Sequence, residues 1–314
     1  MTTPHAHRHG PPPDAPPARV EEVGDGVHAY LQPDGSWFLN NCAFVVGRDG
    51  VVLVDTTSTE WRTRALLEAV AGVTERPVRT VVNTHSHGDH THGNCLLPLA
   101  TIVAHDLCRP AVLEAGTSST AMFPEVDWGE LRVAAPFVTF ADRLTVWVDD
   151  LRVELVHTGA AHTTNDVYAW IPEQRVLLAG DLVFNGGCPF VMMGSVAGSL
   201  DTVAELRALG PEVVVPGHGP VGGPELLDEV EDYLRFVDLT ARAGFEAGRS
   251  PLEAAREADL GRFAAWGETE RLAPNLHRAY SELRGEPRGT PLGIGTMIAD
   301  MVTFNGGRLP HCLA

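Results

Sequence analysis

A unit of hairpin, helix and strand occurs twice in this sequence, and it constrains the fold more than any other feature. In the first copy, residues 43–55 form two apolar runs around a Gly-Arg-Asp-Gly turn, residues 60–71 have helical spacing, and residues 80–85 form a short apolar run. The second copy follows the same order with residues 166–181, 199–209 and 213–218. Two such units predict an α/β protein in which two sheets pack face to face with helices outside, a four-layered αββα sandwich.

The chain divides into three parts by composition and periodicity. Residues 1–19 are rich in Pro and His and lack an apolar run, so we expect a disordered tail. Residues 20–223 carry the two units and form the predicted core. Residues 224–314 form a C-terminal extension that packs on the core and covers or walls the cleft. Its pattern predicts helices over residues 225–245, 251–258 and 268–284, and the apolar final stretch is expected to dock.

Composition limits which partners we expect the protein to bind and in which cell compartment we expect it. With 23 Lys and Arg against 41 Asp and Glu, the net charge of −18 argues against nucleic acid and against an anionic membrane surface. We expect no signal peptide and no membrane helix, because no apolar run reaches the required length. The five cysteines are scattered and form no Cys-x-x-Cys pair, as in a reduced, cytoplasmic protein. The oligomeric state stays open.

Ligand-type side chains stand where the predicted strands end. The segment His85-Ser-His87-Gly-Asp89-His90 places three imidazoles and a carboxylate within six residues. His162, Asp181 and His218 follow at the ends of later strands or loops. Neutral imidazole and carboxylate are the ligands that zinc takes. A cleft that brings together the strand-end residues of both units would therefore hold a metal ion.

This ordered set of motifs resembles that of the metallo-β-lactamase fold superfamily. The resemblance implies that His85, His87 and His162 hold a first metal ion and that Asp89, His90 and His218 hold a second. Asp181 would bridge the two ions. Asp89 and His218 are assigned as catalytic residues, with Asp89 also orienting the attacking water. The expected cofactor is two Zn²⁺, although the same ligands suit Fe or Mn.

Four further residues near these motifs are predicted to act as supports. Asp55, the counterpart of Asp181 in the first unit, is expected to orient the histidine loop. His92 and His157 match no ligand position and are expected to be structural. His105 is also expected to be structural, at the start of a helix.

A dinuclear site of this kind activates water for attack on a carbonyl carbon. Asp181 stands where the best-known zinc β-lactamases carry Cys, which argues against an antibiotic-degrading enzyme. Bulky apolar residues crowd the segments that would border the cleft, and they favour a small-molecule substrate that is apolar or polycyclic. These residues are Trp37, Phe38, Met122, Phe123, Trp128, Phe184, Phe190, Met192 and Met193.

A narrower resemblance suggests the substrate. The segments at residues 80–85, 124–130, 194–200 and 305–314 are similar to those of the cyclase/thioesterases of aromatic polyketide biosynthesis in actinobacteria. This likeness implies a thioesterase/cyclase that closes a ring and releases a polyketide from an acyl carrier protein. Two alternatives stay open: a general small-thioester or lactone hydrolase similar to glyoxalase II, and a non-catalytic metal-binding scaffold.

Overall fold

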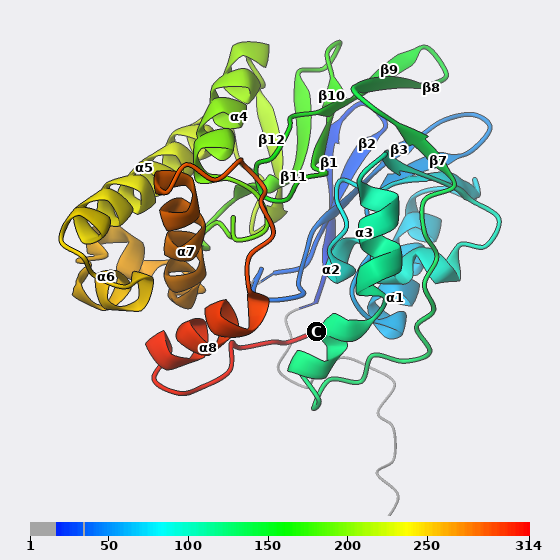
Figure 1. Cartoon of the computed structure of the whole chain (residues 1–314). Helices are drawn as coiled ribbons and strands as arrows, with labels where there is room; N and C mark the ends of the chain where they lie inside the picture. Colours follow the sequence, from blue (N-terminus) through cyan, green and yellow to red (C-terminus); the bar gives the residue numbers. More distant parts are fainter. Residues whose placement is uncertain (1–16, 34) are drawn as a thin grey trace, which may run out of the picture.

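Two β-sheets lie face to face in the middle of the molecule, with helices on both outer sides (Figure 1). The computed structural model describes residues 17–33 and 35–314. Residues 1–16 of the predicted tail lie outside this range, and the first strand begins at Arg19. The predicted αββα sandwich is confirmed.

The first sheet has seven strands in sequence order. Its first four strands form an antiparallel meander, and the last three join it in parallel. The strands are β1 (Arg19–Gly24), β2 (Val27–Leu31), β3 (Cys42–Val46), β4 (Val51–Val54), β5 (Val78–Val82), β6 (Thr101–His105) and β7 (Val138–Phe140).

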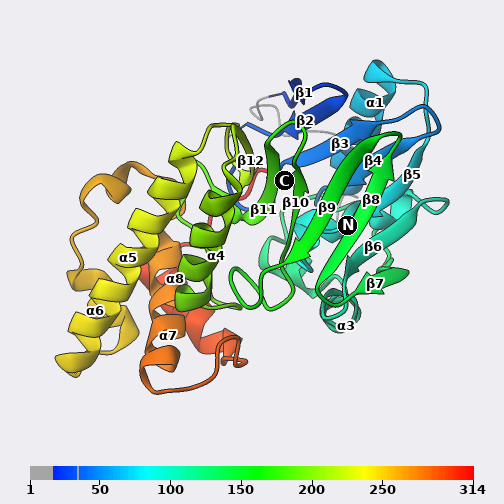
Figure 2. The same ribbon diagram turned by 90° about the horizontal axis from the view of Figure 1, so that it is seen from above.

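The second sheet has five strands in the order β12-β11-β10-β9-β8. Figure 2 shows this sheet, in green, lying over the blue and cyan first sheet. Its strands pair antiparallel except for β11 and β12, which are parallel. The strands are β8 (Arg143–Val148), β9 (Leu151–His157), β10 (Val167–Ile171), β11 (Val176–Phe184) and β12 (Val213–His218).

Both copies of the predicted unit fold in the same way. Hairpin β3–β4 leads through helix α1 (Glu60–Val73) to β5, which runs parallel to β4. Hairpin β10–β11 leads through helix α4 (Val196–Leu209) to β12, parallel to β11. Carboxyl ends of parallel strands lie at one edge of a sheet, so each unit delivers its polar strand-end residues to the same place.

Three apolar layers hold the sandwich together. Val-rich inner faces of the two sheets form the central layer. Helix α1 packs Leu66 and Val70 on the outer face of the first sheet, and α3 (Cys108–Ala115) covers β6. Helices α4, α5 (Glu225–Glu246) and α7 (Leu272–Leu283) cover the second sheet.

The C-terminal extension shares its apolar core with the second sheet. It contains α5, α6 (Pro251–Glu257), α7 and α8 (Ile294–Phe304). Helix α8 was not predicted, because two glycines precede its midpoint and half of its surface is exposed. The final stretch docks as expected: Cys312 pairs with Trp37 and Ala314 is buried against Phe38. The boundary at residues 223/224 stays a prediction.

The helix predicted over residues 268–284 begins only at Leu272, after a 3₁₀ turn at Thr269–Arg271. Two other predicted boundaries were wrong for identifiable reasons. Helix α4 begins at Val196 rather than Ser199, because Ser195 caps it by accepting a hydrogen bond from Gly198 N at 2.8 Å. Strand β11 does not end at Asp181 but continues to Phe184 after a break in register at Gly180.

Across the described part of the chain, none of the helices combines the length and the hydropathy that a membrane span requires.

Leu155→Ala tests the central layer. Leu155 on β9 is fully buried between the sheets, so we expect the substitution to lower the free energy of unfolding by about 2–5 kcal/mol. Chemical denaturation measures this change. Leu239→Ala is the matched control, because Leu239 on α5 is 66% exposed and should cost much less. Equal losses at both positions would contradict the layered packing.

Candidate metal centre

All seven residues predicted as ligands meet at one edge of the sandwich, and we call them the His/Asp cluster. Their ligand-type atoms form two groups, each with all atoms within 4.8 Å of one another. One group contains His85, His87, His162 and Asp181. The other contains Asp89, His90 and His218. The structure therefore brings all seven residues together in two groups, and their role as metal ligands stays a prediction.

The loop after β5 supplies four of the seven cluster residues, two to each group. His85 follows the strand, and His87 is the residue before the short helix α2 (Gly88–Thr91), which carries Asp89 and His90. His87 Nδ1 lies 2.9 Å from His162 Nε2. On the other side, Asp89 Oδ2 lies 3.4 Å from His218 Nε2 and 3.8 Å from His90 Nε2. One tight turn thus faces both groups.

Asp181 lies between the two groups. One of its carboxylate oxygens is 3.1 Å from His90 Nε2. The other is 3.3 Å from His162 Nε2 and 3.5 Å from His218 Nε2. The bulge at Gly180, whose φ of +52° favours glycine, turns this part of β11 toward the cluster. A Cβ at position 180 would also meet the Thr84 side chain at 2.7 Å.

The cluster imidazoles are held by hydrogen bonds through their other ring nitrogens. His90 Nδ1 lies 2.8 Å from Asp55 Oδ2, so Asp55 contacts the loop as predicted. Asp55 also accepts from the Thr84 backbone N–H and hydroxyl, each at 2.7 Å. His218 Nδ1 bonds the Gly35 carbonyl at 3.0 Å, and His162 Nδ1 bonds the Phe190 carbonyl. Such contacts fix the ring orientation of metal-binding histidines.

The backbone partners of His162 and His218 could not be found from the sequence. A carbonyl is present at every residue, so no residue type marks Gly35 or Phe190 as a partner.

Burial keeps three imidazoles of the cluster neutral. It lowers the pKa of His85 and His87 below the ordinary value, and it lowers the pKa of His162 to about 3. Neutral imidazole is the form that binds a metal ion. These three residues are the histidines of the first group.

The carboxylates dominate the second group. Burial lowers the pKa of His218, but Asp181 and Asp89 outweigh it and raise that pKa to about 9. Burial also lowers the pKa of His90, but the carboxylates of Asp181, Asp55 and Asp89 outweigh it and raise that pKa. Burial raises the pKa of Asp89 and Asp181, yet the facing histidines bring both below the ordinary range. The carboxylates are thus ionised and attract positive charge.

Buried polar atoms in the cluster fit a bound cation. His85 Nε2, His90 Nε2 and Asp181 Oδ1 are enclosed yet have no hydrogen-bond partner among the described residues. His90 Nε2 and Asp181 Oδ1 are at ion-pair distance but lack hydrogen-bond geometry. Buried polar atoms without partners are costly, and a metal ion would satisfy all three. The donor set of imidazole and carboxylate suits zinc.

The other histidines take supporting positions. His92 Nδ1 bonds the Ser58 carbonyl at 3.2 Å, and its ring stacks on Phe38. His157 Nδ1 bonds the Asp166 carbonyl at 2.9 Å and stacks on His105, with ring centroids 3.6 Å apart. The placement of His105 at a helix start was wrong: it is the last residue of β6, where it pairs with β7.

Two apolar clusters border the centre and meet at Trp37. The Phe38 cluster also contains Met122, Phe123, Val126, Trp128, Cys312 and Ala314. The Phe190 cluster also contains Met192, Leu292 and Met297. Phe184 stacks on His218 with a 5.2 Å centroid distance, and the 41% exposed Met193 places its sulfur 3.1 Å from His87 Nε2. Phe184, Phe190 and Met193 therefore contact histidines of the cluster, whereas Phe123 is fully enclosed and serves the core.

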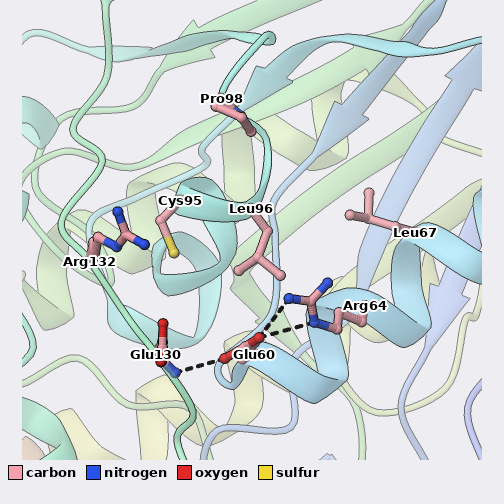
Figure 3. Close-up of a pocket in the computed structure, with 8 residues that line it drawn as sticks. All are labelled: Glu60, Arg64, Leu67, Cys95, Leu96, Pro98, Glu130 and Arg132. Carbon is pink, nitrogen blue, oxygen red and sulfur yellow. Dashed lines mark hydrogen bonds and ion pairs between the residues drawn. The ribbon is translucent and has the colours of Figure 1, made fainter.

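A separate pocket of about 400 Å³ lies at the start of α1 (Figure 3). It is lined by side chains of α1, of the 3₁₀ turn His92–Leu96 and of the segment near Arg132. Glu60 binds Arg64 across its floor at 2.7 Å. No member of the His/Asp cluster lines it, so this pocket is not the candidate centre.

Comparison with known proteins places the chain in a family. The family model described as the metallo-beta-lactamase superfamily matches residues 35–218, more than half of the chain. The chain belongs to the metallo-β-lactamase superfamily. The match begins before β3 and ends at His218, so it spans all seven residues of the cluster.

Relatives and solved structures agree with this placement. The chain is 24% identical to a metallo-beta-lactamase type 2 of Bacteroides fragilis over 71% of its length and 88% of that protein. It is 28% identical to the 2,4-dinitroanisole O-demethylase subunit alpha of a Nocardioides species, over 78% of its length and 68% of that protein. A metallo-beta-lactamase structure from Pontibacter korlensis matches with a TM-score of 0.59 and 24% identity, covering 70% of this chain and 99% of that one.

Superfamily membership and the His/Asp cluster together indicate a metal-dependent hydrolase. Members of this superfamily usually bind zinc.

Asp55→Asn tests the support of the histidine loop. The substitution removes the carboxylate that holds His90 Nδ1, so we expect metal affinity to fall about 10–100-fold. Competition with a chelator measures the affinity. Asp300→Asn is the matched control, because Asp300 holds His277 Nε2 at 2.7 Å between α7 and α8, outside the cluster. Unchanged affinity in Asp55→Asn would show that Asp55 does not position the ligand.

Proposed function

We propose that this protein is a dinuclear metal-dependent thioesterase/cyclase that acts on an aromatic polyketide intermediate bound to an acyl carrier protein. The observation that carries the proposal is the His/Asp cluster together with two apolar clusters joined at Trp37, one of which contains Phe190, whose carbonyl binds His162. Apolar walls beside a few convergent polar groups suit a large apolar substrate. A cytoplasmic location is part of the proposal.

The assignment of ligands follows the two groups. His85, His87 and His162 would hold one ion, Asp89, His90 and His218 the other, and Asp181 would contact both. Two such ions, proposed as zinc, supply an activated water and polarise a substrate carbonyl. Because both groups share one edge of the sandwich, a single thioester carbonyl can reach them together.

Residues of this chain have distinct tasks in that reaction. Asp89 and His218 are proposed as the catalytic residues: their side-chain atoms are 3.4 Å apart at the second group, where Asp89 Oδ1 or Oδ2 can orient the attacking water. The aromatic rings of Trp37 and Phe190, with centroids 5.2 Å apart, would face the planar part of the substrate. The apolar surroundings keep bulk water from the acyl group.

One relative supports an aromatic substrate. The Nocardioides protein is named for 2,4-dinitroanisole, which is an aromatic ether. It matches this chain beyond the family-model region, over 78% of the sequence. The β-lactamase relatives point to a different substrate, so a cephalosporin is included among the substrates to be compared.

Asp181→Ala tests the dinuclear chemistry. The substitution removes the carboxylate between the two groups, so we expect kcat/KM to fall by at least about a hundredfold. Each tenfold fall corresponds to about 1.36 kcal/mol of lost transition-state stabilisation. The variant should remain folded by circular dichroism. Undiminished turnover would mean that water activation lies elsewhere in the protein.

A substrate panel tests the substrate class. We expect kcat/KM for an aromatic polyketide on its acyl carrier protein to exceed that for glutathione thioesters, acyl-CoA and a cephalosporin by at least about tenfold, or 1.4 kcal/mol. Product analysis by mass spectrometry separates hydrolysis from ring closure. Preference for glutathione or acyl-CoA thioesters would support a glyoxalase II-like hydrolase instead. Bound zinc with no turnover would support a metal-binding scaffold.

A further inference from the structure

Helix α7 holds the segment at residues 188–197 along its length. This segment comprises most of the connection after β11 and the first two residues of α4, and α7 lies beside α4 and α5 in both views (Figures 1 and 2). Four polar side chains, spaced by three or four residues, contact the segment. The later a residue lies in the helix sequence, the later its partner lies in the segment. They are Arg271, Asn275, Arg278 and Glu282, and we call them the α7 stripe.

Each member of the stripe binds backbone atoms. Arg271 donates to the Cys188 carbonyl at 2.9 Å. Arg278 donates twice to the Met192 carbonyl, at 3.0 and 2.9 Å. Glu282 accepts from the first N–H groups of α4, at 2.9 and 3.2 Å. Such bonds fix the path of the backbone regardless of which side chains the segment carries.

Asn275 makes the central contact of the stripe. It is fully buried, donates to the Pro189 carbonyl at 2.8 Å and accepts from Val191 N–H at 2.9 Å. These two bonds hold the residues on either side of Phe190. Removing the amide would leave a buried carbonyl and a buried N–H without partners, so the position of Phe190 depends on it.

Phe190 in turn holds a residue of the candidate metal centre. Its carbonyl accepts the hydrogen bond of His162 Nδ1. That bond places the proton on Nδ1 and leaves Nε2, which faces His87 and Asp181, free to bind a cation. The chain of contacts runs from Asn275 through Phe190 to His162.

The segment also touches the His162 loop directly. Ser195 N–H donates to the Ala161 carbonyl at 2.7 Å. Gly194 packs so closely that a Cβ there would lie 1.9 Å from the same oxygen. The segment is therefore fixed between α7 on one side and residues 161–162 on the other.

We propose that the α7 stripe positions His162, and that Asn275 is the positioning residue through which the C-terminal extension sets the affinity of one metal site. This inference rests on the proposed function, since it takes His162 as a ligand. Helix α7 lies outside residues 35–218, which match the family model. The extension thus contributes to the metal centre as well as covering the second sheet.

Cobalt titration of the full chain tests this inference. Metal-free wild type titrated with Co²⁺ should show two steps in visible absorbance, and His162→Ala should abolish one of them. Asn275→Leu should weaken that same step about 10–100-fold and leave the other step within about twofold. Ser281→Ala is the matched control: Ser281 is a buried residue of α7, the substitution removes its partly buried hydrogen bond to Glu286 at 2.6 Å, and it should change neither step.

The outcomes separate the inference from the proposed function. Two unchanged steps in Asn275→Leu, or equal weakening of both, would overturn the positioning role while leaving the dinuclear proposal intact. No cobalt uptake by wild type would overturn the proposed function and this inference with it. If Asn275→Leu does not fold, Arg278→Lys replaces it, because the lysine keeps the charge but not the paired bonds to Met192.

Discussion

The concentration of buried carboxylate charge at one edge of the sandwich is the constraint on which the rest of the structure depends. Asp89 and Asp181 are both buried, and their carboxylates lie within 4 Å of the imidazoles of His85, His90, His162 and His218. Buried charge without compensation destabilises a fold. Protons on His90 and His218 compensate for part of it, and cations would compensate for more. Metal binding and folding stability are therefore linked at this edge.

Both sheets contribute cluster residues to this edge, so the repeated unit in the sequence indicated where those residues gather. Each unit carries a histidine at or shortly after the end of its last strand, His85 or His218, and an aspartate in or just after the preceding hairpin, Asp55 or Asp181. Parallel pairing brings these ends together, so the sequence predicted the sandwich and the gathering of the seven side chains. The two aspartates differ in role because Asp181 lies at the Gly180 bulge, whereas Asp55 faces His90 and Thr84 from behind.

Features that depend on tertiary contacts could not be predicted. Arg62 lies on the buried face of α1, because it bonds Gln32 at 2.7 Å and the Leu313 carbonyl from the other end of the chain. The α7 stripe had a signal, since Arg271, Asn275, Arg278 and Glu282 are spaced by three or four residues and so share one side of a helix. Its partners, however, are backbone atoms, which carry no sequence pattern. The superfamily accounts for the hydrolase chemistry, whereas the C-terminal extension lies outside residues 35–218, which match the family model.

Anomalous diffraction from crystals grown with zinc, collected on both sides of the zinc absorption edge, tests the central claim most directly. The account predicts two zinc peaks at the edge of the sandwich. One should lie among His85, His87 and His162, the other among Asp89, His90 and His218, with Asp181 in contact with both. A single peak, peaks away from these residues, or an Asp181 carboxylate turned away from both ions would contradict it.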